Sequence, residues 1–566
     1  LLQARPLSPA ENLIGSDPWE SPVEGAHWRR TWRLGEWLSD PVTPLFSTWT
    51  LPMLVESREE FGTGILDWEV KGSFSMPKPW FCLINGYFYT RQDRPPRPSD
   101  TGNQQDNINS PSLGERVAQR GRGNKTHLDK WRDEYLPSYL IGLQKHLEFN
   151  IAEASSQQLI SFVNTLTKES GEFWYLMAPI GYGFEESGFN PYYESVVPSK
   201  NRPHYVTLFI GYPSKVMEAQ EHLHSIGQNL RNDRPLSEWF IHSSAEQIVE
   251  LAEFWPSWLR DSINRYVQAY GHQVFTLDFY FPTSGERIED IVNSIQTYLK
   301  HDAPSPWKIM QEAAAGRERA SIHALQSLAN NKTEREYLKD AIEGFQACAS
   351  SREDAGFYFQ RPSALIRHCV LELGSRLKRE GIIEEIEQVF FLEKNELDLI
   401  VENLALGISN PSYAENASIR KHIWERQRLL SAPDRIPMDL KIEGLDHTPE
   451  VLYDATGIRI IGNAASPGRA QGKARVIKSQ HELNQFSKGE ILISNAASPS
   501  LTPLLLIAGG IVTEAGGGAS HSTLIARELG VPAVTNAGNV TQLISTGQLI
   551  EIDGSNGIVK ILDHLL

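Results

Sequence analysis

The chain has 566 residues, 40% of them hydrophobic and 10% aromatic, so it is long enough for two to four globular domains. Its net charge of −16 argues against a nucleic-acid-binding surface. The three cysteines, Cys82, Cys348 and Cys369, lie far apart, which disfavours a disulfide framework or a zinc site and fits a reducing cytoplasm. No stretch reaches the roughly 18 apolar residues that a membrane span needs.

The first part of the chain is rich in aromatic residues. Residues 17–90 hold seven of the fourteen tryptophans, together with Phe81, Tyr87, Phe88 and Tyr89. This density favours core packing over a ligand-lining role. Residues 92–126, rich in Pro, Asn, Ser and Arg, are predicted to form an exposed loop, and residues 121–126 lack the spacing of a phosphate-binding loop.

Helical periodicity dominates from about Ser155 onward. The predicted helices cover residues 245–269, 287–299, 334–348, 362–377 and 395–406. Residues 434–456 are polar and proline-bearing, as is typical of a hinge-like linker. Strands predicted at 470–476, 490–494, 507–513 and 549–552 indicate a compact α/β unit. The expected fold class is multidomain α+β, a large mainly helical domain followed by a small α/β domain.

A glycine-dense turn at residues 513–522 joins a buried apolar run to a short helix, which stops at Gly530 with Pro532 just beyond. Ser520 is placed to cap this helix, and His521 lies in its first turn. Free backbone N–H groups there favour a neutral imidazole and stabilise a phosphate attached to it, although the dipole contributes only about 0.3–1 kcal/mol. The simpler interpretation is a glycine turn before a solvated histidine.

The wider sequence around this turn favours the functional interpretation. The residues that carry it are Ile511-Val512-Thr513-Glu514, Gly516-Gly517, Ser520-His521, Ala526-Arg527-Glu528, Gly530 and Pro532-Ala533-Val534, with Ala465-Ser466-Pro467-Gly468-Arg469-Ala470, Gly472-Lys473-Ala474-Arg475-Val476, Gly489-Glu490-Ile491-Leu492 and Thr502-Pro503-Leu504 upstream. Together they resemble the phosphohistidine domain of the phosphoenolpyruvate (PEP)-utilising enzymes. The resemblance implies that His521 is phosphorylated on a domain that swivels between two active sites. It implies a site made of His521, Ser520, Arg527, Thr513, Gly517 and Gly518.

The central part resembles the rifampin phosphotransferase branch of this family. The residues concerned are Gly35-Glu36, residues 40–45, Tyr270-Gly271-His272 with Asp278 and Pro282, and Arg352-Glu353 with Tyr358, Arg361 and Arg367. The resemblance implies substrate contacts by His272, Asp278, Arg352, Glu353 and Arg361. An arginine can hold a phosphoryl group, and His272 or Asp278 can accept a hydroxyl proton, although each residue type is also common in structural roles.

Residues 1–6 resemble the closing strand of an ATP-grasp nucleotide domain, in which Gln3 and Arg5 would be the last ATP contacts; the alternative is an ordinary N-terminal strand. The expected domains are therefore 1–8, the end of a nucleotide domain; 9–440, the substrate-binding domain; and 441–566, the phosphohistidine domain. ATP and Mg²⁺ would bind through a nucleotide domain, fused upstream or on a separate subunit. The sequence shows no ligand set for a metal.

The resemblance implies a dikinase-type phosphotransferase that passes a phosphoryl group from ATP through His521 to a small molecule, with a hydroxyl favoured. Because the chain ends at Leu566, soon after the histidine domain, we expect an acceptor other than pyruvate. Three alternatives stay open: a ligase that uses the phosphoryl group to drive a condensation, the phosphohistidine subunit of a split phenylphosphate synthase-like enzyme, and a non-catalytic phosphocarrier. The sequence does not identify the acceptor.

Overall fold

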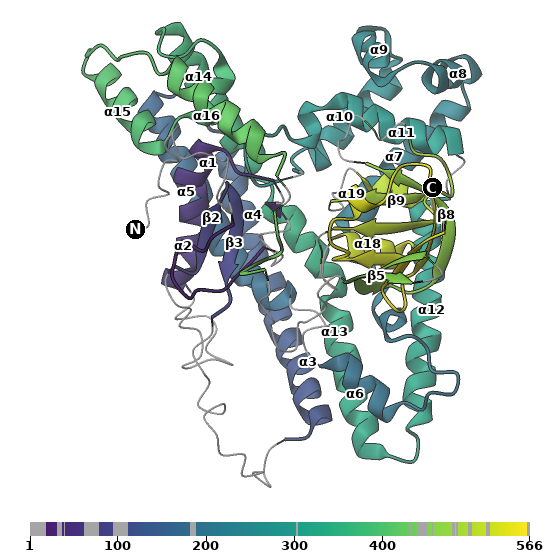
Figure 1. The fold of residues 1–566 in the computed structure, drawn as a ribbon. Coiled ribbons are helices and arrows are strands. Elements are labelled where there is room, and N and C mark those ends of the chain that lie inside the picture. The colour runs from purple at the N-terminus through teal and green to yellow at the C-terminus, as the bar shows by residue number, and fades with distance from the viewer. Residues whose placement is uncertain are drawn as a thin grey trace.

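The computed structural model describes residues 19–30, 37–38, 40–61, 79–93, 111–181, 188–274, 276–301, 304–430, 432–438, 450–454, 457–477, 482, 485–495, 501–514, 516 and 521–562. Helices dominate this part of the chain up to Gln427, and a β-sheet unit follows (Figure 1). The predicted fold class, a large mainly helical part followed by a small α/β unit, is confirmed. Within the described ranges, no helix is both long enough and apolar enough to cross a membrane.

A small sheet ties the two ends of the helical part together. Its strands lie in the order β2 (Phe81–Ile84), β3 (Tyr87–Arg91), β1 (Trp28–Arg29) and β4 (Arg435–Ile436), and all neighbours are antiparallel. The aromatic residues of this region pack as the sequence predicts, because Trp28, Trp49, Trp80, Phe88 and Tyr89 are buried. The tryptophans at 32 and 68 lie outside the described residues.

The helical part follows in chain order. Its elements are α1 (Pro44–Thr48), α2 (Thr50–Phe61), α3 (Leu113–Lys130), the π-helix η2 (Trp131–Tyr135), α4 (Leu136–His146), α5 (Ser156–Gly181), α6 (Phe189–Val196), the 3₁₀-helix η4 (Tyr205–Phe209), α7 (Lys215–Arg231), α8 (Arg234–His242), α9 (Ala245–Glu250), the 3₁₀-helices η5 (Ala252–Phe254) and η6 (Ser284–Glu286) on either side of α10 (Ser257–Tyr270), α11 (Ile288–His301), α12 (Pro306–Ser327), α13 (Lys332–Phe359), α14 (Ser363–Arg379), the 3₁₀-helix η7 (Ile386–Phe391), α15 (Lys394–Ala405) and α16 (Ala414–Gln427). The predicted helices at 287–299, 334–348, 362–377 and 395–406 are confirmed as α11, α13, α14 and α15.

The prediction of a single helix over residues 245–269 is wrong, because the structure divides this range into α9, η5 and α10. Pro256 explains the break: its ring disfavours the helical conformation of the preceding residue. Trp255 accordingly has φ −62° and ψ 142°, an extended conformation.

The exposed loop predicted over residues 92–126 is also wrong in its second half, where α3 begins at Leu113 after the N-cap Ser112. Ser112 accepts a hydrogen bond from the backbone N–H of Glu115 at 3.1 Å. The helix packs closely against α13 through two glycines: a Cβ on Gly344 would lie 2.2 Å from the carbonyl oxygen of Gly121. Residues 94–110 lie outside the described part.

The C-terminal unit is a nine-stranded sheet. Its strands lie in the order β5 (Glu450–Asp454), β6 (Gly457–Ile461), β13 (Ile558–Ile561), β12 (Leu549–Asp553), β8 (Arg469–Val476), β9 (Ile491–Ser494), β10 (Gly510–Thr513), β11 (Ala533–Thr535) and β7 (Asn463–Ser466). The central strands β8, β9, β10 and β11 are parallel, and the others pair antiparallel. Among the described residues of this unit, the short helices α17 (Thr502–Leu505), α18 (His521–Glu528) and α19 (Val540–Leu543) lie between these strands in the sequence. The strands predicted near 470–476, 490–494, 507–513 and 549–552 are confirmed as β8, β9, β10 and β12.

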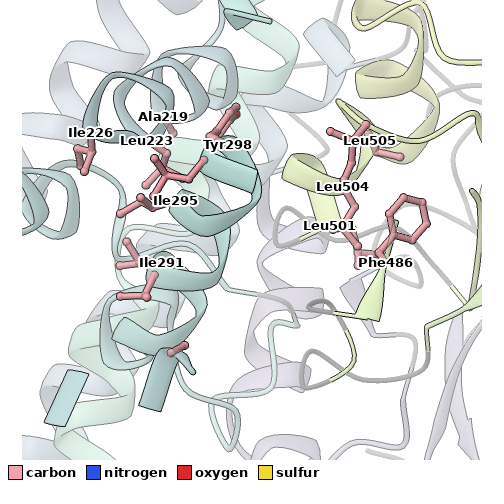
Figure 2. Close-up of a cluster of buried hydrophobic side chains, with 14 of the residues drawn as sticks. Ala219, Leu223, Ile226, Ile291, Ile295, Tyr298, Phe486, Leu501, Leu504 and Leu505 are labelled. Carbon is pink, nitrogen blue, oxygen red and sulfur yellow. The ribbon is translucent and has the colours of Figure 1, made fainter. Parts of the chain in front are cut away.

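Alternate residues of the parallel strands supply two different cores. Ile491, Ile493 and Val512 face a core inside the sheet unit. Leu492 and Ile511 belong instead to a core that continues through α17 and α18 into helices α7 to α11. Figure 2 shows this second core, in which Ile291, Ile295 and Tyr298 of α11 face Phe486, Leu501, Leu504 and Leu505 of the sheet unit. The sheet unit therefore packs against the helical part through apolar side chains.

The linker predicted over residues 434–456 is too long, because both of its ends are strands. Arg435 and Ile436 form β4 and pair with Arg29 and Trp28 of β1. Glu450–Asp454 forms β5 of the C-terminal sheet. Residues 439–449 lie outside the described part, and the domain limits at residues 8 and 440 remain predictions.

The contact between α3 and α13 yields a stability prediction. Gly344→Ala should lower the free energy of unfolding by about 1–3 kcal/mol, because the new methyl group must push two helix backbones apart. Gly316→Ala on α12 is the matched control, since nothing lies within 4 Å of its added Cβ. Alanine there should be neutral or stabilising by up to about 1 kcal/mol. Urea denaturation followed by circular dichroism measures both, and equal stabilities would contradict the close packing.

Candidate functional site

The glycine-rich turn lies at the carboxyl ends of the parallel strands. Thr513 ends β10 and pairs with Ser494, which ends β9. Glu514, the next residue, accepts hydrogen bonds from the backbone N–H and hydroxyl of Thr541 at 3.0 and 2.6 Å, so the start of the turn is fixed to α19. Gly516 has φ +124°, a conformation that side chains rarely permit. This edge is where open α/β sheets usually bind ligands.

His521 is the first residue of α18, as the sequence predicts. The helix ends at Glu528, and Gly530, with φ +66°, closes it. Of the other residues predicted to act with His521, Gly517, Gly518 and Ser520 lie outside the described residues. Thr513 is fully buried at the end of its strand.

Arg527 anchors α18 to the sheet. It is 3% exposed, and its Nε donates a hydrogen bond of 2.6 Å to the carbonyl oxygen of Ala465 on β7. With about 100° of rotation per residue, position 527 lies on a different face of the helix from position 521. This geometry gives Arg527 a role in holding the helix in place, and direct chemistry by Arg527 remains a prediction.

Glu528 lies seven residues after His521, which is close to two helical turns, so these two positions share one face of α18. Its Oε2 accepts a hydrogen bond of 2.6 Å from the backbone N–H of Gly211 in the helical part. Burial raises the pKa of Glu528 to about 8, and the charge of Glu353 adds to this effect, although the Gly211 N–H and the Arg317 guanidinium oppose it. The face of α18 that carries position 521 is therefore held toward the helical part.

The loop that receives Glu528 is shaped by Arg317 of α12. The Nη1 of Arg317 donates hydrogen bonds to the carbonyl oxygens of Ile210 and Gly211 at 2.6 and 2.7 Å. Its guanidinium also lies 3.8 Å from the centre of the Tyr212 ring. Gly211 has φ +78°, and a Cβ there would lie 2.3 Å from the backbone nitrogen of Ala314. The loop is thus tied tightly to α12.

The C-terminal half of α13 brings charged residues to the same region. Glu353 is half-buried, and its charge adds to the effect of burial, which raises the pKa of both Asp354 and Glu528. Asp354 accepts a hydrogen bond of 2.7 Å from the backbone N–H of Lys215, the first residue of α7. Burial, as the largest cause, raises the pKa of Asp354 to about 6. Arg352 is a residue of α13 as well.

His272 and Arg361 lie together beside the end of α13. The Nε2 of His272 is 3.1 Å from the carbonyl oxygen of Phe357, so it is the nitrogen that carries the proton, and Nδ1 of the neutral ring is an acceptor. Burial and the nearby charge of Arg361 lower the pKa of His272 to about 4. His272 is therefore neutral at pH 7. The structure thus gathers three of the predicted substrate residues, His272, Glu353 and Arg361, around one end of α13.

Asp278 lies in surroundings typical of a residue with a structural role. It is 1% exposed, and its carboxylate accepts hydrogen bonds from the backbone and hydroxyl of Thr43 at 2.6 and 3.0 Å and from the backbone N–H of Tyr280 at 3.0 Å. These bonds hold the start of α1 against the loop that follows α10. Proton transfer by Asp278 remains a prediction, but its oxygens already have protein partners.

Several residues of this region were missed by sequence reasoning. Gly211, Tyr212, Lys215, Arg317 and Asp354 carry no motif, and the only local signal for the loop is the presence of glycine and proline, residues common in turns, at positions 211 and 213. Gln3 and Arg5, predicted to contact ATP, lie outside the described residues. Among the residues that the structure does describe, no group of three or more His, Cys, Asp or Glu side chains could hold a metal ion.

Two family models match the chain. Residues 486–557 match the mobile domain of PEP-utilising enzymes, and residues 176–353 match the fourth domain of rifampicin phosphotransferase. The first range contains α18, and the second contains the 210–212 loop, Arg317 and Glu353. The resemblance to the PEP-utilising enzymes and their rifampicin phosphotransferase branch is therefore confirmed, and it relates the chain to a family of phosphotransferase enzymes.

Individual relatives agree with this class. The protein named uncharacterized phosphotransferase YvkC of Bacillus subtilis is 24% identical over 596 residues, which cover 100% of this chain and 66% of the relative. Rifampicin phosphotransferase of the same organism is 28% identical over 318 residues, 55% of this chain and 36% of the relative. A probable phosphoenolpyruvate synthase of Methanothermobacter thermautotrophicus is 37% identical over 112 residues, 20% of this chain and 16% of the relative. The chain thus spans less than two thirds of the length of these relatives.

The buried carboxylate of Asp278 yields a pH prediction. Burial raises its pKa from 3.8 to about 6, so the folded protein holds a proton that the unfolded chain releases. The free energy of unfolding should therefore fall by up to roughly 3 kcal/mol as the pH rises from 4 to 6. Asp278→Asn should remove this part of the pH dependence, and Asp261→Asn, at an exposed position, should not. Thermal unfolding at several pH values measures the difference; identical profiles for wild type and Asp278→Asn would contradict the assignment.

Proposed function

We propose that the protein is an ATP-dependent, dikinase-type phosphotransferase in which His521 carries the phosphoryl group to a hydroxyl of a small molecule. The observation that carries this proposal is the position of His521: it opens α18 after the glycine turn, on the helix face that Glu528 holds toward the helical part. A histidine nucleophile divides one difficult transfer into two easier ones through a covalent intermediate.

The start of α18 suits a phosphorylated histidine. The first turn of a helix has backbone N–H groups without intrahelical acceptors, and the helix dipole is positive at this end. Both features stabilise the negative charge of a phosphoryl group. They also disfavour a positive charge on the ring, which favours the neutral, nucleophilic imidazole.

The acceptor is proposed to bind beside the C-terminal end of α13, where His272, Glu353 and Arg361 lie. Arg361 supplies a positive charge that can hold phosphoryl oxygens. His272 is neutral, and its Nδ1 is the nitrogen able to accept the hydroxyl proton as the bond to phosphorus forms. Arg352, also on α13, is proposed as a second phosphoryl contact.

ATP and Mg²⁺ are proposed to bind to a nucleotide domain, fused or separate, to which Gln3 and Arg5 contribute. In such a site Mg²⁺ would neutralise the charge of the phosphates. The described residues do not form such a metal site, so we assign no step to them there. We also propose a cytoplasmic location, because Cys82, Cys348 and Cys369 are all free thiols.

The proposal predicts that His521→Ala abolishes phosphate incorporation. The complete enzyme, or this chain with its nucleotide domain, is incubated with ATP labelled at the transferred phosphate. Wild type should acquire an acid-labile, base-stable label, the signature of a phosphohistidine, and the variant none. His323→Asn, at an exposed position of α12, is the control and should label normally. A labelled His521→Ala protein would refute the assignment.

The products separate a phosphotransferase from a ligase. With the true acceptor, phosphorus NMR should show AMP and inorganic phosphate in equal amounts, together with one new phosphoester. This follows because a dikinase splits ATP into AMP, one phosphate and one phosphoryl group on the histidine. Two phosphates per AMP, with a condensed organic product, would instead establish the ligase.

A further inference from the structure

The contact between Glu528 and the 210–212 loop joins two parts of the chain that lie far apart in the sequence. Glu528 belongs to α18 of the sheet unit, whereas Gly211 precedes α7 of the helical part, 317 residues earlier. The Tyr212 backbone N–H also interacts with the Glu528 carboxylate. The carboxylate is thus received by consecutive backbone N–H groups of one loop.

The receiving loop is held by contacts within the helical part that do not involve Glu528. Arg317 binds the carbonyl oxygens of Ile210 and Gly211 and stacks on Tyr212, and its charge attracts the carboxylate. A side chain at position 211 would collide with α12. A preformed set of donors costs little conformational entropy on binding. We name this set, the backbone of residues 210–212 together with Arg317, the carboxylate socket.

From these contacts we propose that Glu528 is a positioning residue: by entering the carboxylate socket, it fastens the helix that begins at His521 to the helical part and sets the docked position of the sheet unit. Seven residues along one helix separate the fastened position from the histidine, which is about 10 Å at 1.5 Å per residue. A shift at Glu528 therefore moves position 521 almost as a rigid body. The consequence for phosphoryl transfer rests on the proposed function, but the docking itself does not.

The charges around the socket make this docking sensitive to pH. Facing Glu528 are Arg317 from α12, Tyr212 from the loop and Glu353 from α13; burial raises the pKa of Tyr212 to about 12, so its hydroxyl stays neutral. On α18 itself, Arg527 lies near His204 of the helical part, and burial together with the charge of Arg527 lowers the pKa of His204. Burial, the largest cause, and repulsion by Glu353 raise the pKa of Glu528, so the docked carboxyl retains a proton at a pH where a solvent-exposed one loses it.

The proton bound by the docked carboxyl sets the direction in which docking depends on pH. An undocked Glu528 has the usual pKa near 4.5, and docking raises it to about 8. Docking therefore takes up a proton between these values, and the docking equilibrium should weaken by up to tenfold per pH unit as the pH rises toward 8. Glutamine keeps the carbonyl acceptor for the Gly211 N–H and cannot ionise, so Glu528→Gln should dock with no such pH dependence. Glu528→Lys should be repelled by Arg317.

Hydrogen exchange of the 566-residue chain tests the proposal without any activity measurement. Protection factors, corrected for the intrinsic pH dependence of exchange, are measured for peptides covering 205–212 and 521–529 between pH 6 and 8.5. Wild type should lose protection in both peptides as the pH rises, Glu528→Gln should stay protected, and Glu528→Lys should be unprotected throughout. Glu551→Gln, on β12 beside Lys560, is the control and should follow wild type.

Two results would overturn the proposal: protection in Glu528→Lys equal to wild type, or the same pH profile in wild type and Glu528→Gln. Circular dichroism separates undocking from unfolding, since an undocked variant keeps its helical signal. If Glu528→Lys fails to fold, the comparison of the pH profiles of wild type and Glu528→Gln still tests the proposal.

In the complete enzyme, the rate of transfer from phosphorylated His521 to the acceptor should fall at least tenfold in Glu528→Lys relative to the rate of His521 phosphorylation by ATP. An unchanged ratio would show that the socket does not position the histidine for transfer. Absence of any phosphohistidine in wild type would instead refute the proposed function and leave the exchange result standing.

Discussion

The position of α18 depends on the contacts of its last residues. A helix of eight residues is not stable alone in water, so its geometry must come from packing. Ile525 and Ala526 bury their side chains in the core shared with α7 to α11, Arg527 binds β7, and Glu528 binds the 210–212 loop. The apolar contacts hold the helix in this shared core, and the carboxyl group of Glu528 accepts a hydrogen bond directly from the helical part. The orientation of the histidine end is thereby determined from the opposite end of the helix.

In the proposed function the sheet unit changes its position, so its contacts with the helical part must be specific without being too strong to break. Apolar packing of α17 against α11 is non-directional. The Glu528 contact is directional, and it places a group of raised pKa beside the like charge of Glu353. Such a contact selects one arrangement while contributing little net stability, because desolvation of the carboxyl offsets much of the attraction. This combination suits a position that is occupied transiently.

The sequence allowed the strongly periodic helices and the parallel strands to be predicted, because each buries a continuous apolar face. Helix α3 was missed since its sequence is polar and contains Gly121, and its stability comes from α13, more than 200 residues later in the chain. His521 was identifiable because local signals, a glycine turn before the helix and Gly530 with Pro532 after it, fix the start of α18. The partner of Glu528 could not be identified from the sequence, because no local pattern indicates that Gly211 lies beside it.

The pairing of β1 with β4 sets a limit on travel. Trp28 and Ile436 are neighbours across two hydrogen-bonded strands, so the polypeptide enters and leaves the helical part at points about 5 Å apart. The hydroxyls of Tyr87 and Tyr89 hold the departing segment by its carbonyl oxygens at Gln427, Leu430 and Pro433. From Ile436 to Glu450 the chain has 14 peptide steps, and even a fully extended chain of this length spans at most roughly 50 Å. While β4 stays paired with β1, Glu450 therefore lies within that distance of the small sheet. In the proposed function, a second site for His521 must lie within the same radius, extended only by the size of the sheet unit itself.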